Sequence, residues 1–269
     1  TMKCLHHSSV NHYEELYPKN RYETIRIKML CNWCTSRDLC NEWNNMCEKD
    51  YTWKNIEITW EDTDIDYYVI INYPCTTDYY DKKKTIVFQM EPWVNDKHKN
   101  WGVKTWGIWA DPNPDDFFKV IGRNSNTYNN VFWQFKLELN ELMNVKYEKK
   151  NILSCVTSNK YFDEGHIARI DFLKFLEKKG DVNLHIFGNV EGLNFKSHQH
   201  QLQPLDKHSG IVPYKYYFMG ENNYEKDFIT EKLWEPILCE SLTFYYGCPN
   251  VDDYIDTNAY VQLDMNDFE

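Results

Sequence analysis

Short apolar runs alternate with longer mixed segments along the chain, and this pattern predicts strands separated by helices. In the first half, runs rich in β-branched and aromatic residues occupy positions 24–30, 55–60, 66–73 and 84–90, and such runs favour strands. Between the first two, residues 36–49 have a mixed pattern that indicates a helix. We therefore expect a parallel sheet with covering helices in this half.

The second half repeats the arrangement. Its strand-like runs are 151–157, 183–188, 214–220 and 241–247. One helix is expected to end at Gly180, and another to begin at Thr230 as its N-cap. The fold class is therefore α/β, with one domain at 1–145 and a second at 146–269. The boundary follows a helix expected over 130–143.

The helix that begins at Thr230 has a lysine in its first turn. The positive end of the helix dipole lies there and favours an acid by roughly 0.3–1 kcal/mol, so Lys232 is unexpected. A helix N-terminus with a lysine beside it is an anion site, since free N–H groups, dipole and ammonium act on one charge. A phosphate-bearing ligand explains the pattern. The alternative is that Lys232 reaches solvent or pairs with Glu231 or Glu235.

Charge and composition exclude several classes of protein. The formal net charge is −11 and no long basic run occurs, which argues against nucleic acid as a partner. No apolar run approaches the roughly 18 residues of a membrane span, and the first residues lack the apolar centre of a signal peptide. Nine scattered cysteines favour reduced thiols. We expect a soluble, cytoplasmic protein, with a trimmed luminal domain of a Golgi-type enzyme as the alternative.

Residues 214–255 resemble a known donor-binding motif. They contain Tyr-Lys-Tyr at 214, 215 and 216, Glu-Asn at 221 and 222, and Thr-Glu-Lys at 230–232. This order is similar to the motif of glycosyltransferase family 10, the α1,3/α1,4-fucosyltransferases. Residues 158–180 resemble the family segment whose helix carries an arginine, here Arg169. The resemblance is strongest over 151–260, and in the first half it rests mainly on 87–93.

The resemblance implies two facing Rossmann-like domains of the GT-B type, with acceptor bound by 1–145 and donor by 146–269. It implies an inverting glycosyltransferase that moves L-fucose from GDP-fucose onto a hydroxyl of a glycan acceptor, without a metal cofactor. Phe228 stands where many members have tyrosine, and Met219-Gly220 where they have Ala-Phe. Another donor such as UDP-xylose therefore remains open, as does a catalytically silent sugar-binding or nucleotide-binding module.

The resemblance also implies roles for individual residues. Arg169 and Lys232 stabilise charge on the leaving diphosphate, and Glu231 accepts hydrogen bonds from the ribose. The full set of expected donor-site residues is Arg169, Tyr214, Glu221, Asn222, Phe228, Thr230, Glu231 and Lys232. Glu91 is the expected base, although a carboxylate there also suits a loop cap. Its competitors, Asp111, Asp115 and Asp116, lie in a turn-like segment.

The acceptor site has weaker signals. Trp101, Trp106 and Trp109 form a cluster that suits either a platform for sugar rings or the core of the sheet.

Three groups have some of the residues of a metal site. They are Asp62 with Asp64, Cys31 with Cys34, Cys40 and Cys47, and His198 with His200. We interpret them as an acidic turn, buried thiols and a polar loop, and predict no metal site.

Overall fold

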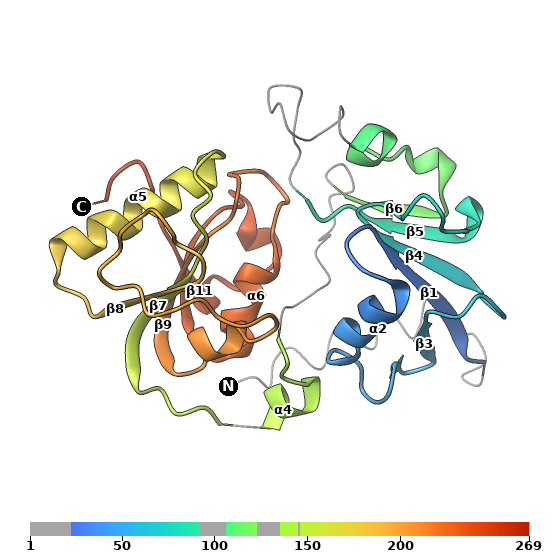
Figure 1. Ribbon diagram of the computed structural model, residues 1–269, viewed down its shortest axis with the longest axis horizontal. Coiled ribbons are helices and arrows are strands. Elements are labelled where there is room, and N and C mark those ends of the chain that lie inside the picture. The colour runs from blue at the N-terminus through green and yellow to red at the C-terminus, as the bar shows by residue number, and fades with distance from the viewer. Residues whose placement is uncertain (1–22, 92–105, 123–134, 145, 269) are drawn as a thin grey trace.

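The computed structural model describes residues 23–91, 106–122, 135–144 and 146–268. Figure 1 shows two α/β units side by side, each built on its own sheet. The first sheet has six strands in the order β2-β3-β1-β4-β5-β6, and all neighbours are parallel except β2 and β3. Its strands are β1 Ile25–Cys31, β2 Thr52–Trp53, β3 Ile56–Thr59, β4 Tyr67–Ile71, β5 Thr85–Phe88 and β6 Lys119–Ile121, and its helix is α2 Ser36–Asn44.

The second sheet has five strands in the order β11-β10-β9-β7-β8, all parallel. Its strands are β7 Asn151–Val156, β8 Leu184–Phe187, β9 Tyr214–Gly220, β10 Leu242–Tyr246 and β11 Tyr260–Gln262, and its helices are α5 Glu164–Lys179 and α6 Glu231–Leu238. A further helix, α4 Leu139–Asn144, precedes this sheet. The 3₁₀ turns are Lys82–Lys84, Gly107–Ala110, Pro114–Asp116, Lys207–Gly210, Val251–Asp253 and Thr257–Ala259.

Both faces of the second sheet are buried, because a helix covers each. Along β9, Tyr217 and Met219 pack in one core with Leu233 of α6, whereas Phe218 packs in another with Leu173 of α5. Successive side chains of a strand point to opposite faces, so α5 and α6 lie on opposite sides of the sheet. Figure 1 shows α6 nearer the first unit and α5 along the outer flank.

The α/β class and the main strands predicted from the sequence are confirmed. The predicted run 214–220 matches β9 at both ends, and α5 ends before Gly180, whose φ of 70° gives the left-handed cap. The strands β2, β6 and β11 were not predicted, because two or three residues are too short to establish a period. The helix expected over 130–143 is wrong in extent: among its described residues the helix begins only at Leu139.

The segment before the proposed domain boundary contacts both units. Phe135 and Leu142 pack in the core that contains α6, while Asn45 at the end of α2 donates its side-chain N–H to the Phe135 carbonyl at 2.8 Å. A boundary at 145/146 stays a prediction. Among the described residues, no helix is long and apolar enough to cross a lipid bilayer.

Gly165, in the first turn of α5, allows the helix to approach the chain after β9. Its N–H donates to the Asn222 carbonyl at 3.0 Å, and an added Cβ would lie 1.9 Å from the Glu221 carbonyl oxygen. We expect Gly165→Ala to lower the free energy of unfolding by about 1–3 kcal/mol or more, because backbone must move. Urea unfolding measures this loss. The exposed neighbour Glu164→Ala is the control; equal stability of the two variants would contradict the packing.

Candidate functional site

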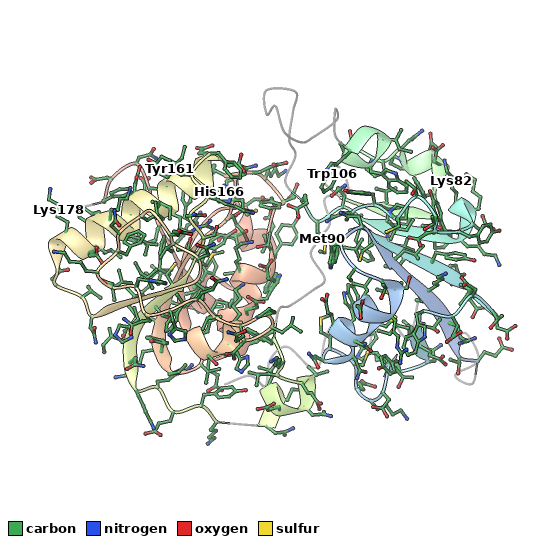
Figure 2. All side chains as sticks on the ribbon, viewed as in Figure 1. Lys82, Met90, Trp106, Tyr161, His166 and Lys178 are labelled. Carbon is green, nitrogen blue, oxygen red and sulfur yellow. The ribbon has the colours of Figure 1, made fainter. Side chains whose placement is uncertain are left out.

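A cavity of about 480 Å³ lies between the two units. The first unit lines it with Trp33, Glu42, Asn72, Met90 and Glu91, and the second with Pro204, Leu205, Asn222, Phe228, Thr230, Glu231 and Lys232. Trp33, Asn72 and Glu91 follow β1, β4 and β5, and Asn222 follows β9. The carboxyl ends of the two parallel sheets therefore meet at one cavity, the place where such folds bind ligands. Figure 2 shows Met90 on the flank of the first unit that faces the second.

Glu91 is held in place by a buried asparagine at the end of the neighbouring strand. Asn72 has a left-handed backbone with φ of 61°, and its N–H donates to the Phe88 carbonyl at 2.8 Å. Its side-chain oxygen accepts from the Met90 N–H at 2.9 Å. Asn72 thus ties the end of β4 to the loop that carries Glu91.

The environment of Glu91 suits a proton acceptor. Burial raises the pKa of this carboxyl above its ordinary value, and the positive charge of Lys232 in the opposite unit partly counteracts the rise. Such a carboxylate binds a proton more readily than an exposed one does. The geometry therefore sets a carboxyl group with a raised pKa on one wall of the cavity and a cation on the other.

The N-terminus of α6 has the arrangement predicted from the sequence. Thr230 is the N-cap, and its hydroxyl accepts from the Lys232 N–H at 3.3 Å and lies 3.2 Å from the Lys232 ammonium. Lys232 Nζ also pairs with Glu231 Oε1 at 3.3 Å and lies 4.0 Å from Glu221 Oε2. Lys232 therefore pairs with Glu231, as the ion-pair interpretation predicted, and it also lines the cavity, while the anion site stays a prediction.

Glu221 is fully buried and fixes the cap of α6 from below. One of its oxygens accepts from the Thr230 N–H at 2.8 Å and the other from the Thr230 hydroxyl at 2.7 Å. Burial raises the pKa of Glu221, while Lys232 and these hydrogen bonds oppose the rise. Glu221 acts on the cavity through Thr230 and Lys232, because it is absent from the cavity wall.

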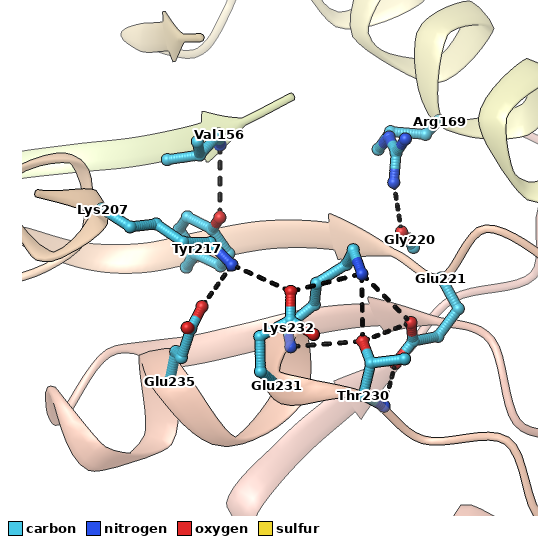
Figure 3. A network of polar contacts seen from close by, with 10 residues as sticks. All are labelled: Val156, Arg169, Lys207, Tyr217, Gly220, Glu221, Thr230, Glu231, Lys232 and Glu235. Atoms are coloured by element: carbon cyan, nitrogen blue, oxygen red, sulfur yellow. Dashed lines mark hydrogen bonds and ion pairs between the residues drawn. The ribbon is translucent and has the colours of Figure 1, made fainter. Parts of the chain in front are cut away.

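Two lysines lower the pKa of Glu231. Burial alone would raise its pKa, but Lys232 and Lys207 outweigh that effect and hold the pKa at about 2. Lys207 Nζ lies 3.4 Å from Glu231 Oε1 and forms a short contact with Glu235, whose side chain is fully buried. Figure 3 shows the resulting chain of contacts from Glu235 through Lys207 and Glu231 to Lys232. The ionised Glu231 is therefore positioned by two lysines.

Arg169 contributes a second buried cation from α5. Its Nη1 donates to the Gly220 carbonyl at 2.6 Å, and among the described residues its Nε has no hydrogen-bond partner. Burial lowers the pKa of the guanidinium, and Glu221 and Glu231 are among the charges that oppose this. Arginine stays protonated at such a site, so its charge is available near the α6 N-terminus.

The structure brings most of the predicted donor-site residues together. Asn222, Phe228, Thr230, Glu231 and Lys232 line the cavity, with Glu91 opposite. Arg169 and Glu221 lie behind this wall.

Tyr214 is not brought to the cavity. It begins β9, whereas the site follows the end of that strand, and its hydroxyl hydrogen-bonds His185 Nδ1 at 2.7 Å.

Two members of the predicted tryptophan platform, Trp106 and Trp109, are absent from the cavity wall. Trp101 lies outside the described residues. The Trp106 ring lies 5.1 Å from that of Tyr73, and the Trp109 ring packs against Phe117 at 5.5 Å and Tyr80 at 6.2 Å. Trp109 thus belongs to the edge of a core cluster. The tryptophan that lines the cavity is Trp33, which is 43% exposed.

The sequence did not single out several residues of this region, among them Trp33, Glu42, Asn72 and Lys207. Lys207 and Glu235 are 28 positions apart in the chain, and only the fold makes their contact. The one available signal was for Trp33, since it follows a strand whose carboxyl end was expected at the cleft.

In the described part of the chain, no group of three or more His, Cys, Asp or Glu side chains has the arrangement of a metal site. Asp62 pairs with Lys28, and His198 Nε2 lies 3.0 Å from the Gly188 carbonyl. Eight cysteines in the described ranges are free thiols. That activity needs no metal remains a prediction.

Comparison with known families identifies the second unit. Residues 145–269 match Glycosyltransferase family 10 (fucosyltransferase), C-terminal part. The matched segment contains α5, α6 and all five strands of the second sheet.

Curated relatives share a shorter segment. The chain is 39% identical over 51 residues to GDP-fucose protein O-fucosyltransferase 3 of Xenopus laevis, and 38% identical over 48 residues to the protein of that name from Bos taurus. These matches cover 19% and 18% of this chain. They span only 11% and 10% of the two relatives.

Solved structures share the fold of the whole chain. A crystal structure of an α1,3-fucosyltransferase with GDP has a TM-score of 0.51 and 16% identity, covering 95% of this chain and 79% of its own. A second α1,3-fucosyltransferase structure has a TM-score of 0.51 and 14% identity, with coverages of 91% and 75%. The predicted GT-B fold is thereby confirmed, and the family match confirms the predicted resemblance of the second unit to family 10. The second unit of this chain is thus similar to the C-terminal part of glycosyltransferase family 10, the fucosyltransferases, over residues 145–269.

Proposed function

We propose that this protein is an inverting glycosyltransferase that moves L-fucose from GDP-fucose onto an acceptor hydroxyl. The observation that carries the proposal is the pairing of opposite groups across one cavity. Lys232 at the α6 N-terminus lies on one wall, and Glu91 lies on the other. A nucleotide sugar needs a cationic site for its diphosphate, and an inverting displacement needs a base on the opposite face.

The cationic wall is suited to a leaving diphosphate. Negative charge develops on the β-phosphate as the glycosidic bond breaks, and Lys232 with Arg169 would stabilise that charge. The free N–H groups of α6 add to the attraction. Glu231, ionised by Lys207 and Lys232, would accept hydrogen bonds from the ribose hydroxyls. In this proposal the positive charge comes from side chains, and no bound metal takes part.

The opposite wall would supply the base. Glu91 would remove the proton of the acceptor hydroxyl as its oxygen attacks the anomeric carbon. Attack on the face opposite the diphosphate inverts that centre. Asn72 would hold Glu91 for this step through the Met90 N–H.

Two acceptor classes follow from different observations. The family resemblance favours a glycan hydroxyl. The curated relatives are named protein O-fucosyltransferases, which favours a hydroxyl on a protein side chain. We keep the glycan as the first candidate, and an acceptor assay with both classes distinguishes them.

A thermal-shift titration with GDP, UDP and their sugar conjugates tests the donor. A ligand that binds only the folded protein stabilises it by about 2.7 kcal/mol at 100 times its Kd. We expect stabilisation by GDP and GDP-fucose. A preference for UDP species would replace the donor and retain the mechanism. A shift without turnover would indicate a catalytically silent binding module, and the absence of any shift would contradict the proposed donor site at Lys232.

Lys207 should hold the cluster together, so its loss should destabilise the protein. Lys207→Met leaves Glu235 buried without its cation, and we expect a loss of about 3–5 kcal/mol in the free energy of unfolding. The double variant Lys207→Met, Glu235→Gln should recover most of it, because no buried charge remains unpaired. Urea unfolding measures both. Lys179→Met, at an exposed pair with Asp181, is the control and should change little.

A further inference from the structure

Two cysteines at the carboxyl end of β1 lie in contact. Cys31 is the last residue of the strand and is buried, and Cys34 is half-buried and precedes Thr35, the N-cap of α2. Their Sγ atoms are 3.5 Å apart, and Cys31 Sγ lies 3.6 Å from the Cys34 carbonyl oxygen. Both are free thiols, and the glycosyl transfer proposed above uses neither.

We propose that Cys31 and Cys34 are a redox modification site, a pair that forms a reversible intramolecular disulfide beside the cavity. A disulfide bond is about 2.05 Å long, so the two sulfurs need to approach by only about 1.5 Å. The residues between them form a bend after β1, and rotation of the side chains together with a small adjustment of that bend supplies this approach.

The position of the pair gives the modification a consequence. The two cysteines bracket Trp33, whose side chain lines the cavity with Glu42 of α2. Burial raises the pKa of the Glu42 carboxyl, and a hydrogen bond with the Trp33 side chain offsets part of that rise. A disulfide would tie the end of β1 to the start of α2, and so restrict the loop that holds Trp33 at the cavity wall. The loop is short, so the global gain in stability is small.

The chemistry is a thiol–disulfide exchange with a small disulfide such as oxidised glutathione. The more accessible Cys34 loses its proton and attacks one glutathione sulfur, which forms a mixed disulfide and releases one glutathione thiolate. The Cys31 thiolate then attacks the Cys34 sulfur and releases the second. Two cysteine thiols are oxidised and one disulfide is reduced, and the two protons go to the released thiolates. Burial raises the pKa of both thiols, so uncatalysed exchange is slow.

The neighbouring cysteines have different surroundings. Cys75 Sγ lies 3.6 Å from the Cys31 carbonyl oxygen and is exposed. Cys47 Sγ lies 3.7 Å from the Trp43 carbonyl oxygen. The Sγ atoms of Cys31 and Cys34, in contrast, are in contact with each other. The disulfide is therefore expected at this pair.

Peptide mass spectrometry tests the proposal directly. Trypsin cleaves after Lys28 and Arg37, so one peptide, residues 29–37, carries both thiols. The folded protein is equilibrated in glutathione buffers from fully reduced to fully oxidised, and free thiols are then blocked with iodoacetamide. We expect two alkyl groups on this peptide in reduced buffer. In oxidised buffer we expect none, with a mass lower than the dithiol by two hydrogen atoms.

Variants identify the partners. Cys31→Ser should leave Cys34 as a mixed disulfide with glutathione, and Cys75→Ser should behave as the unmodified chain does. A peptide that stays doubly alkylated in every buffer, or carries glutathione in the unmodified chain, would overturn the proposal. The readout is a mass on the unmodified protein, so it is independent of donor, of turnover and of whether a variant folds.

Discussion

Lys232→Ala is expected to abolish most of the turnover and the stabilisation by GDP. The ammonium lies at the N-terminus of α6 on the cavity wall, where it would meet the charge that develops on the leaving diphosphate. Loss of one such stabilising group typically lowers kcat by roughly 10²–10³-fold. Steady-state kinetics with GDP-fucose and a thermal-shift titration with GDP measure the two effects.

The matched control for this change is Lys226→Ala. Lys226 is exposed, lies six residues away in the chain and is absent from the cavity wall. Its loss should leave both readouts close to those of the unmodified protein. An undiminished GDP shift in Lys232→Ala would show that the diphosphate binds elsewhere, and the proposed donor site would then be wrong.

Glu91→Gln is expected to remove catalysis while leaving donor binding intact. The amide keeps the size of the side chain but cannot accept the acceptor proton, and a positioned base contributes roughly 10²–10⁴-fold. We expect kcat to fall by that factor and the GDP shift to stay unchanged. Asp115→Asn is the control, since Asp115 is an exposed carboxylate within the 3₁₀ turn Pro114–Asp116. An equal fall in kcat in the two variants would contradict the assignment of Glu91 as the base.

The pH dependence gives Glu91 an independent signature. The base works in its ionised form, so kcat/KM should fall as pH falls through the pKa of Glu91. Because burial raises that pKa, the acid limb should lie above the ordinary range of a glutamate. Lys232 lowers the same pKa. In Lys232→Ala the pKa of Glu91 should therefore rise, and the acid limb of the residual activity should lie at still higher pH. An acid limb at the same pH in Lys232→Ala and in the unmodified protein would contradict its assignment to Glu91.

The start of α6 could be predicted because its parts are adjacent in the chain. Thr230, Glu231 and Lys232 are consecutive, and the N-cap, the charge and the apolar stripe that follows all have a local signature. The strands after which the polar residues lie have equally local patterns, so the carboxyl edge of the second sheet was predictable. Tyr214 shows the limit of this reasoning. It belongs to the same motif, yet a seven-residue strand separates it from Glu221, and it lies at the other end of the sheet.

The sequence by itself determined the two α/β units, the order of their main strands along the chain, and the N-cap and lysine at the start of α6, because each depends on propensities and spacings within a few residues. Only the tertiary structure decided which side chains share the cavity. Trp33 and Glu42 face Lys232 across it, and Lys207 meets Glu235 inside the second unit. Such contacts depend on how the sheets pack and on buried charges finding partners, and no local pattern contains that information.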